Sequence, residues 1–238
     1  MGRSIFIICL GLLLTTLAVA QSSEVTEAFD RGQSNFERGR YEMAVFEYQT
    51  ALAWPGGHAA RAQFNIGVCR HRQGRFSDAA DAYRLAIKRR DGRYPAASYA
   101  LGLALQELKQ GPEAREAFAQ AVSASGGRHA GALFELALDS QRSEADLAAI
   151  DYYRRAIKES RDQIPAGHNN LGVLLARSGE IREALREFEV ALKQSKGRFA
   201  EARENLELGR RLLESSSRPL LARFKTVEDL SGKNLWAE

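Results

Sequence analysis

Small and aromatic residues recur along this chain with a period of 35 residues, which aligns the sequence with itself five times. Three columns of this alignment lie four and three residues apart, so their members share one face of a helix. The columns hold alanine, an aromatic residue and alanine: Ala44, Tyr48 and Ala51; Ala79, Tyr83 and Ala86; Ala114, Phe118 and Ala121; Ala149, Tyr153 and Ala156; Ala184, Phe188 and Ala191. The pattern predicts one helix per period, with a ring between two small residues on its packing face.

A fourth column of small residues lies upstream of the alanine–aromatic–alanine face and predicts a second helix in each period. Its members are Gly32, Gly67, Gly102, Ala137 and Gly172. Turn glycines separate the two helices at Gly39, Gly74, Gly111 and Gly179, while the fourth period has Ser143–Asp146 there. Further glycines, at Gly57, Gly92, Gly127 and Gly197, suit the left-handed residue that ends a helix. The sequence therefore predicts an all-α fold of tandem helix–turn–helix units.

These columns resemble the tetratricopeptide repeat, a helix–turn–helix unit of 34 residues. A clear instance is Asn170-Leu171-Gly172, followed by Gly179, Ala184, Phe188 and Ala191. The period here is one residue longer, and the opening Trp of the family is absent. The resemblance implies a right-handed α-solenoid over residues 25–214, with first helices lining a concave groove. The expected repeats are about 25–59, 60–94, 95–129, 130–164 and 165–199, followed by a charged capping helix over 200–214.

The two ends of the chain differ from the repeats. Arg3, an apolar run and Ala18-Val19-Ala20 form the three parts of a secretory signal peptide over residues 1–20. Cleavage is favoured over an uncleaved anchor, which indicates a periplasmic or secreted protein. Residues 215–238 are predicted to be a linker and a tail, in which Phe224 and Val227 lie among apolar residues at helical spacing. Two fates of the tail stay open: it docks on the array, or it folds on a partner.

Composition argues against several classes of function. The net charge is +4, and +3 once Arg3 leaves with the signal peptide, which is too weak a balance to indicate a nucleic-acid partner. After loss of Cys9, Cys69 has no partner for a disulfide, and a buried apolar role is favoured over a reactive one. The four histidines lack metal-ligand spacing, and no glycines form a phosphate-binding loop. We expect a non-catalytic protein without cofactor or metal, and without membrane insertion beyond the signal segment.

The resemblance suggests which residues would contact a protein or peptide partner. One column of first-helix rings either lines the groove or packs in the core, and the sequence leaves both open: Phe29, Phe64, Tyr99 and Phe134, with Asn169 in the fifth repeat. Arginines further along these helices would form a charged margin: Arg72, Arg142 and Arg177. Asparagines in the next column resemble those with which some family members bind a peptide backbone: Asn65, Asn170 and Asn205.

These features favour an envelope or secreted adaptor that binds a peptide segment or a partner helix in its concave groove. One alternative is a structural subunit of an envelope, secretion or pilus assembly. Another is a glycan-binding or peptidoglycan-binding module, because exposed aromatic rings stack on sugars.

Overall fold

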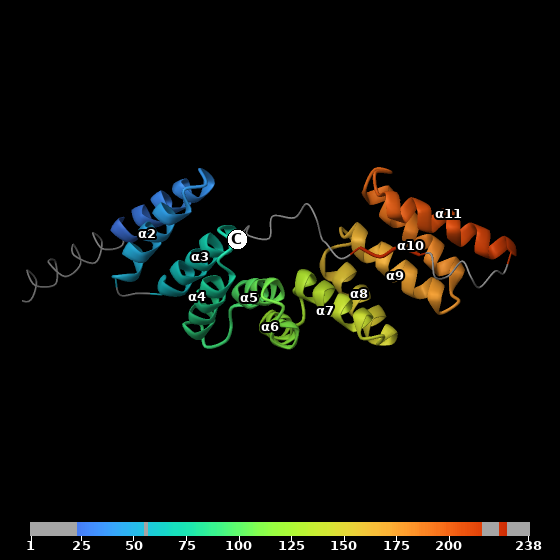
Figure 1. Ribbon diagram of the computed structural model, residues 1–238, viewed down its shortest axis with the longest axis horizontal. Coiled ribbons are helices and arrows are strands. Elements are labelled where there is room, and N and C mark those ends of the chain that lie inside the picture. Colours follow the sequence, from blue (N-terminus) through green and yellow to red (C-terminus); the bar gives the residue numbers. More distant parts are fainter. Residues whose placement is uncertain (1–22, 55–56, 216–223, 228–238) are drawn as a thin grey trace, which may run out of the picture. The chain divides into compact units, whose positions relative to one another are not determined.

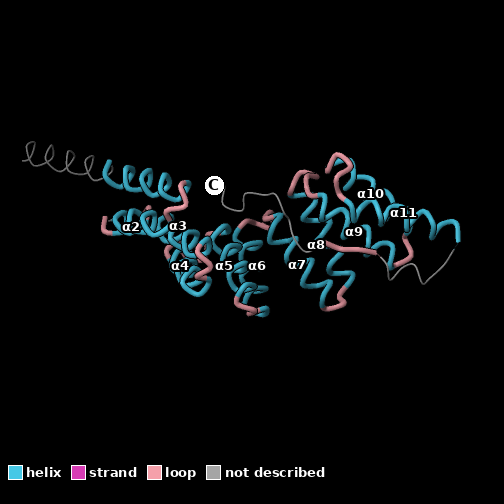
Figure 2. Tube along the Cα trace, turned by 45° about the horizontal axis from the view of Figure 1, so that its top comes forward, coloured by secondary structure: helices cyan, strands magenta, loops and turns pink. Residues whose placement is uncertain are grey.

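The computed structural model describes residues 23–54, 57–215 and 224–227, and these residues form helices joined by short turns, without a β-strand (Figures 1 and 2). The predicted signal peptide lies outside the described residues, as does most of the tail. The helices are residues 23–37, α2 Tyr41–Leu52, α3 Ala59–Arg72, α4 Phe76–Lys88, α5 Pro95–Glu107, α6 Gly111–Ala124, α7 Ala130–Arg142, α8 Asp146–Glu159, α9 Pro165–Arg177, α10 Ile181–Gln194 and α11 Ala200–Ser215. The expected all-α fold is confirmed.

The chain divides into two compact units, residues up to Ala114 and residues from Arg115 onward. In the first unit, α3 packs against α4, and α4 packs against α5. In the second unit, α7 packs against α8 and α9 against α10, while α11 packs against α10 and α9. The predicted first and second helices of the second, fourth and fifth repeats thus lie side by side, as α3 with α4, α7 with α8 and α9 with α10.

The periodic columns form the core of both units. Every alanine and aromatic residue of the alanine–aromatic–alanine face is at most 2% exposed. The glycine column lies directly against the rings. A Cβ added at Gly67 would stand 2.5 Å from the Tyr83 ring, and one at Gly172 would stand 2.6 Å from the Phe188 ring. The column is small because the ring of the second helix occupies the space that a side chain would need.

The turns within the helix pairs keep one backbone conformation even where the residue changes. Gly39, Gly74 and Gly179 have φ angles of 71°, 72° and 93°. At the same place in the other two turns, Lys109 and Glu144 adopt φ angles of 59° and 58°. Gly111, expected to form the turn before α6, is instead the first residue of that helix. The left-handed turn residue therefore recurs every 35 residues even where glycine does not, because the turn needs that backbone conformation whatever the side chain.

Candidate functional site

Residues 224–227 of the tail lie against the second unit, beside α9 and α11 (Figures 1 and 2). This short segment is neither helix nor strand. It is more than fifty residues from Asn169 and Asn170 of α9 in the sequence, yet these two asparagines and Asn205 of α11 bind its backbone. Of the two fates that the sequence left open for the tail, the structure shows docking for these four residues.

Lys225 is bound through its main chain by two asparagine side chains. Its N–H donates to Asn205 Oδ1 at 2.8 Å, and its carbonyl accepts from Asn205 Nδ2 at 2.7 Å. The same carbonyl also accepts from Asn169 Nδ2 at 2.9 Å. Asn205 thus pairs with both polar groups of one residue, and a side-chain amide can do this because it carries a donor and an acceptor side by side.

Asn170 binds Val227 in the same way, two residues further along the tail. The Val227 N–H donates to Asn170 Oδ1 at 2.8 Å, and the Val227 carbonyl accepts from Asn170 Nδ2 at 2.6 Å. Alternate residues whose N–H and C=O both face one side are a feature of an extended strand, and the paired exchange of two hydrogen bonds resembles one antiparallel β-bridge. Asn170 and Asn205 therefore recognise the backbone conformation at Lys225 and Val227, and not the identity of their side chains.

The three asparagines form one connected network. Asn205 Nδ2 donates to Asn169 Oδ1 at 2.8 Å, and Asn169 Nδ2 donates to Asn170 Oδ1 at 3.2 Å. Asn170 Nδ2 also donates to the Tyr153 hydroxyl at 3.1 Å. Each amide nitrogen thus has two acceptors, which matches its two N–H donors. All three side chains are fully buried, so a loss of the tail would leave several of these donors without a protein partner.

Apolar contacts accompany these hydrogen bonds. The Phe224 ring stacks on Phe188 of α10, with centroids 5.7 Å apart and planes inclined by 19°. Phe224 and Val227 are both partly buried against the core of the second unit. The four tail residues thus combine a ring contact, an aliphatic contact and main-chain pairing.

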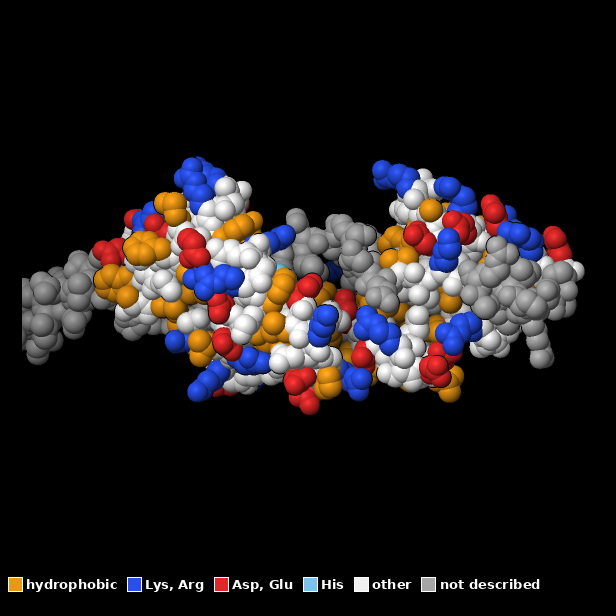
Figure 3. Space-filling model, in the orientation of Figure 1, with side chains coloured by type: hydrophobic (Ala, Val, Ile, Leu, Met, Phe, Trp, Pro, Cys, Tyr) orange, Lys and Arg blue, Asp and Glu red, His pale blue; other side chains and the backbone are white. Residues whose placement is uncertain are grey.

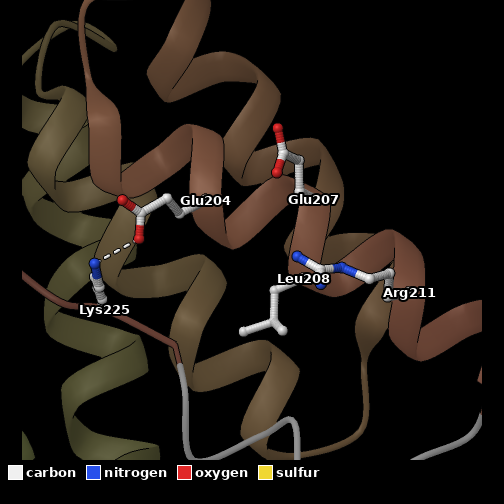
Figure 4. Close-up of a pocket in the computed structure, with 5 residues that line it drawn as sticks. All are labelled: Glu204, Glu207, Leu208, Arg211 and Lys225. Atoms are coloured by element: carbon white, nitrogen blue, oxygen red, sulfur yellow. Dashed lines mark hydrogen bonds and ion pairs between the residues drawn. The ribbon is translucent and has the colours of Figure 1, made fainter.

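The surface beside the tail is charged. Lys225 Nζ lies 2.5 Å from a carboxylate oxygen of Glu204, and both side chains are more than half exposed. These two residues line a small cavity of about 180 Å³ together with Glu207, Leu208 and Arg211 of α11 (Figure 4). An ion pair this exposed contributes about 0–1 kcal/mol, so Lys225 is held mainly by its backbone. Elsewhere on the face seen in Figure 3, basic and acidic side chains are interspersed.

The aromatic column expected either in the groove or in the core lies in the core. Its rings are at most 6% exposed: Phe29, Phe64, Tyr99 and Phe134. Because these rings present almost no surface, they are poor candidates for partner contact. The glycan-binding alternative also loses the exposed ring faces on which it depended.

The remaining sequence candidates are spread over the chain. Asn65 of α3 hydrogen-bonds Tyr48 and lies in the first unit, so it does not join the asparagine network. Arg72 and Arg142 are exposed, and Arg177 pairs with Asp146 at 3.4 Å. Of the ten candidates, the structure brings together Asn170 and Asn205.

Asn169, Phe188 and Phe224 belong to the site but were not among the sequence candidates. Asn169 was visible only as a break in the aromatic column. A polar residue in an otherwise aromatic column is a signal that could have marked the site, because something else must then cover the ring beside it. Phe188 fits the ordinary core pattern, and nothing in the sequence pairs it with Phe224.

Other chemistry in the described residues is sparse. They contain no cluster of metal-ligating side chains, and none of their helices is long and apolar enough to span a membrane. Cys69 is buried, and its burial raises the pKa of the thiol to about 12. It therefore stays protonated and poorly nucleophilic at neutral pH.

Comparison with known proteins agrees with this architecture. A search of curated proteins found no match. Among solved structures, the chain is similar to Pseudomonas aeruginosa pilF (20% identity, 86% of this chain, 90% of that chain, TM-score 0.66). It is also similar to YrrB, described as a TPR protein with an unusual peptide-binding site (20%, 74%, 88%, 0.60), and to a tetratricopeptide repeat protein from Parabacteroides merdae (16%, 84%, 77%, 0.62). At these identities the likeness shows the fold alone.

The family itself is shown by sequence. The profile of the tetratricopeptide repeat matches residues 29–98, 73–129 and 99–164, which together span more than half of the chain. With the helix pairs and the glycine–ring contacts described above, these matches establish that the chain belongs to the tetratricopeptide repeat family.

Proposed function

We propose that this protein is an exported, non-catalytic adaptor that binds an extended segment of a partner protein through Asn169, Asn170 and Asn205. The observation that carries the proposal is the main-chain pairing of these asparagines with Lys225 and Val227. Asparagines that pair with alternate backbone units suit a polypeptide ligand of varied sequence. Proteins that capture extended peptides obtain affinity from such main-chain hydrogen bonds.

The family and one structural relative also support a binding function. Tetratricopeptide repeat proteins act as scaffolds for protein interactions, and one structural relative, YrrB, is described as having a peptide-binding site. The proposed export rests on residues 1–20, whose sequence has the parts of a signal peptide.

A peptide array tests the proposal. The full-length chain is applied to immobilised ten-residue peptides of varied sequence, beside a variant with Asn170→Ala and Asn205→Ala. We expect bound peptides to lose about tenfold or more in affinity for the variant, because each lost hydrogen bond contributes about 0.5–1.5 kcal/mol. Asn65→Ala is the matched control, since Asn65 bonds Tyr48 outside the network.

Circular dichroism and thermal unfolding establish that the variants remain folded. If no peptide distinguishes the parent from the double variant, the asparagines do not bind partners and the proposal fails. If the Asn65→Ala variant loses as much binding as the double variant, the site lies elsewhere.

A further inference from the structure

Ring pairs recur between the two helices of a pair, and the α9–α10 pair lacks one of its two rings. In three pairs, a ring of the first helix packs against a ring of the second with centroids 5.6–5.8 Å apart: Phe29 with Tyr48, Phe64 with Tyr83, and Phe134 with Tyr153. The two members of each pair are 19 residues apart in the sequence. The same spacing in the α9–α10 pair joins Asn169 to Phe188. Phe188 therefore has no ring partner from α9.

Phe224 provides Phe188 with a ring partner at the usual distance. Its centroid lies 5.7 Å from that of Phe188, the same distance as in the other ring pairs. This ring comes from the tail, so the tail supplies the aromatic partner that α9 lacks because it has Asn169 at that position. The planes are inclined by 19°, where the other three pairs are inclined by 44–68°, so the incoming ring stacks more flatly than the built-in ones.

Asn169 has two effects at once. It is smaller than phenylalanine, so it leaves room beside Phe188 for a ring from outside the pair. Its amide also donates to the carbonyl of Lys225, the residue directly after Phe224. Asn169 thus leaves space for an aromatic side chain and binds the peptide group next to it. We call this space beside Phe188 the seat; it suits an aromatic residue in an extended segment.

The same contacts define which segments fit. The seat takes an aromatic side chain, and the residue three positions later places an aliphatic side chain against the core, as Val227 does. The first and third residues after the ring must donate a backbone N–H, which excludes proline at both. Lys225 contributes only an exposed ion pair by its side chain, so other residues fit there.

We propose that the α9–α10 pair is a receptor for the aromatic side chain of an extended partner segment with the pattern aromatic, any except proline, any, aliphatic, and that Phe224–Val227 is a tethered ligand which such a segment displaces. The proposal rests on the peptide-binding function proposed above. Among the residues that the structure describes, the contact comprises four tail residues, with one stacked ring and hydrogen bonds to two backbone units, and a contact of this size permits exchange. A ligand on the same chain competes at an effective concentration of about a millimolar.

A binding assay with the tail sequence tests the proposal. The probe is a fluorescent peptide of residues 221–230, and its binding to the full-length chain is followed by fluorescence polarisation. In a Phe224→Ala chain the tethered ring is absent, so we expect the peptide to bind about tenfold or more tightly than to the parent. A peptide with alanine in place of its phenylalanine should lose that binding. Phe46→Ala is the matched control, because Phe46 is 66% exposed on α2, and it should bind the peptide like the parent.

The outcomes separate this inference from the function on which it rests. If the peptide binds the Phe224→Ala chain no better than the parent, the tail is a fixed part of the fold and the inference is wrong. It is also wrong if the peptide lacking its aromatic residue binds equally well. In either case, the adaptor function still stands if some array peptides bind the parent chain and lose affinity for the variant with Asn170→Ala and Asn205→Ala. If no array peptide distinguishes these two chains, the adaptor function itself is refuted.

Discussion

Replacing Gly172 with alanine tests whether the glycine column and the tail seat are physically coupled. The added Cβ would stand 2.6 Å from Cε1 of Phe188, where ordinary contact begins at 3.4 Å, and 3.1 Å from the carbonyl oxygen of Ala184. The backbone neighbour restricts movement of α9, so the Phe188 ring must shift. Because Phe224 stacks on that ring, the shift disturbs the seat of the tail.

The cost follows from two opposing effects. Overpacking of a core typically destabilises by about 1–3 kcal/mol. Alanine is favoured over glycine inside a helix by about 1 kcal/mol. We therefore expect a net loss of roughly 1–2 kcal/mol in the free energy of unfolding. Gly67→Ala is the matched comparison, since its Cβ would stand 2.5 Å from the Tyr83 ring in the other unit.

Two measurements distinguish the variants. Urea unfolding followed by circular dichroism should show a similar loss of stability in both. Amide hydrogen exchange of Lys225 and Val227, whose N–H groups donate to Asn205 and Asn170, should accelerate only with Gly172→Ala. If both variants are as stable as the parent, the steric reasoning is wrong. If the two amides keep their protection in Gly172→Ala, the tail does not depend on the position of Phe188.

Three further predictions concern single groups. Cys69, whose pKa is raised to about 12 by burial, should react with a thiol reagent only at the rate of unfolding, and immediate labelling of the native protein would contradict its burial. Burial lowers the pKa of His129, and its Nδ1 accepts from Ala132 N, so the neutral ring is favoured in the fold. The folded protein should therefore lose stability as the pH falls below about 6.5, and His129→Asn, which keeps a capping acceptor, should lose less between pH 7.5 and 5.5 in urea titrations. Gly179→Ala should cost about 1 kcal/mol through its left-handed backbone, whereas Glu144→Gly at the equivalent turn should cost nothing; equal losses of thermal stability would refute this reading.

The fold could be predicted from the sequence because the packing rules repeat. A ring between two alanines, with a small residue on the facing helix, recurs every 35 residues. The close packing of the Tyr83 ring on Gly67 is one example of this contact. Turn chemistry was predicted less well. Lys109 takes the left-handed position that the pattern had assigned to Gly111, because the geometry of the turn constrains the backbone more strongly than the residue type.

The candidate site could be predicted only in part. The asparagine column pointed to backbone binding, and Asn170 and Asn205 do bind backbone, that of the chain's own tail. The tail's docking could not be inferred, because four residues have too little pattern to specify a contact with asparagines more than fifty residues away. Arg72, Arg142 and Arg177 were chosen from their position along the first helices alone, and this position does not show where a bound segment would lie.

The amide pairing at Lys225 and Val227 has a consequence for solubility. A protein that captures extended chains with the edge of a β-sheet exposes a row of unpaired donors and acceptors, and such an edge can recruit further strands without limit. Here the pairing groups are side chains on helices, and each engages one backbone unit. The captured segment gains the hydrogen bonds of a strand, yet the helices that hold it have no main chain to offer to the next one. Recognition of an extended chain is thereby separated from the tendency of extended chains to polymerise.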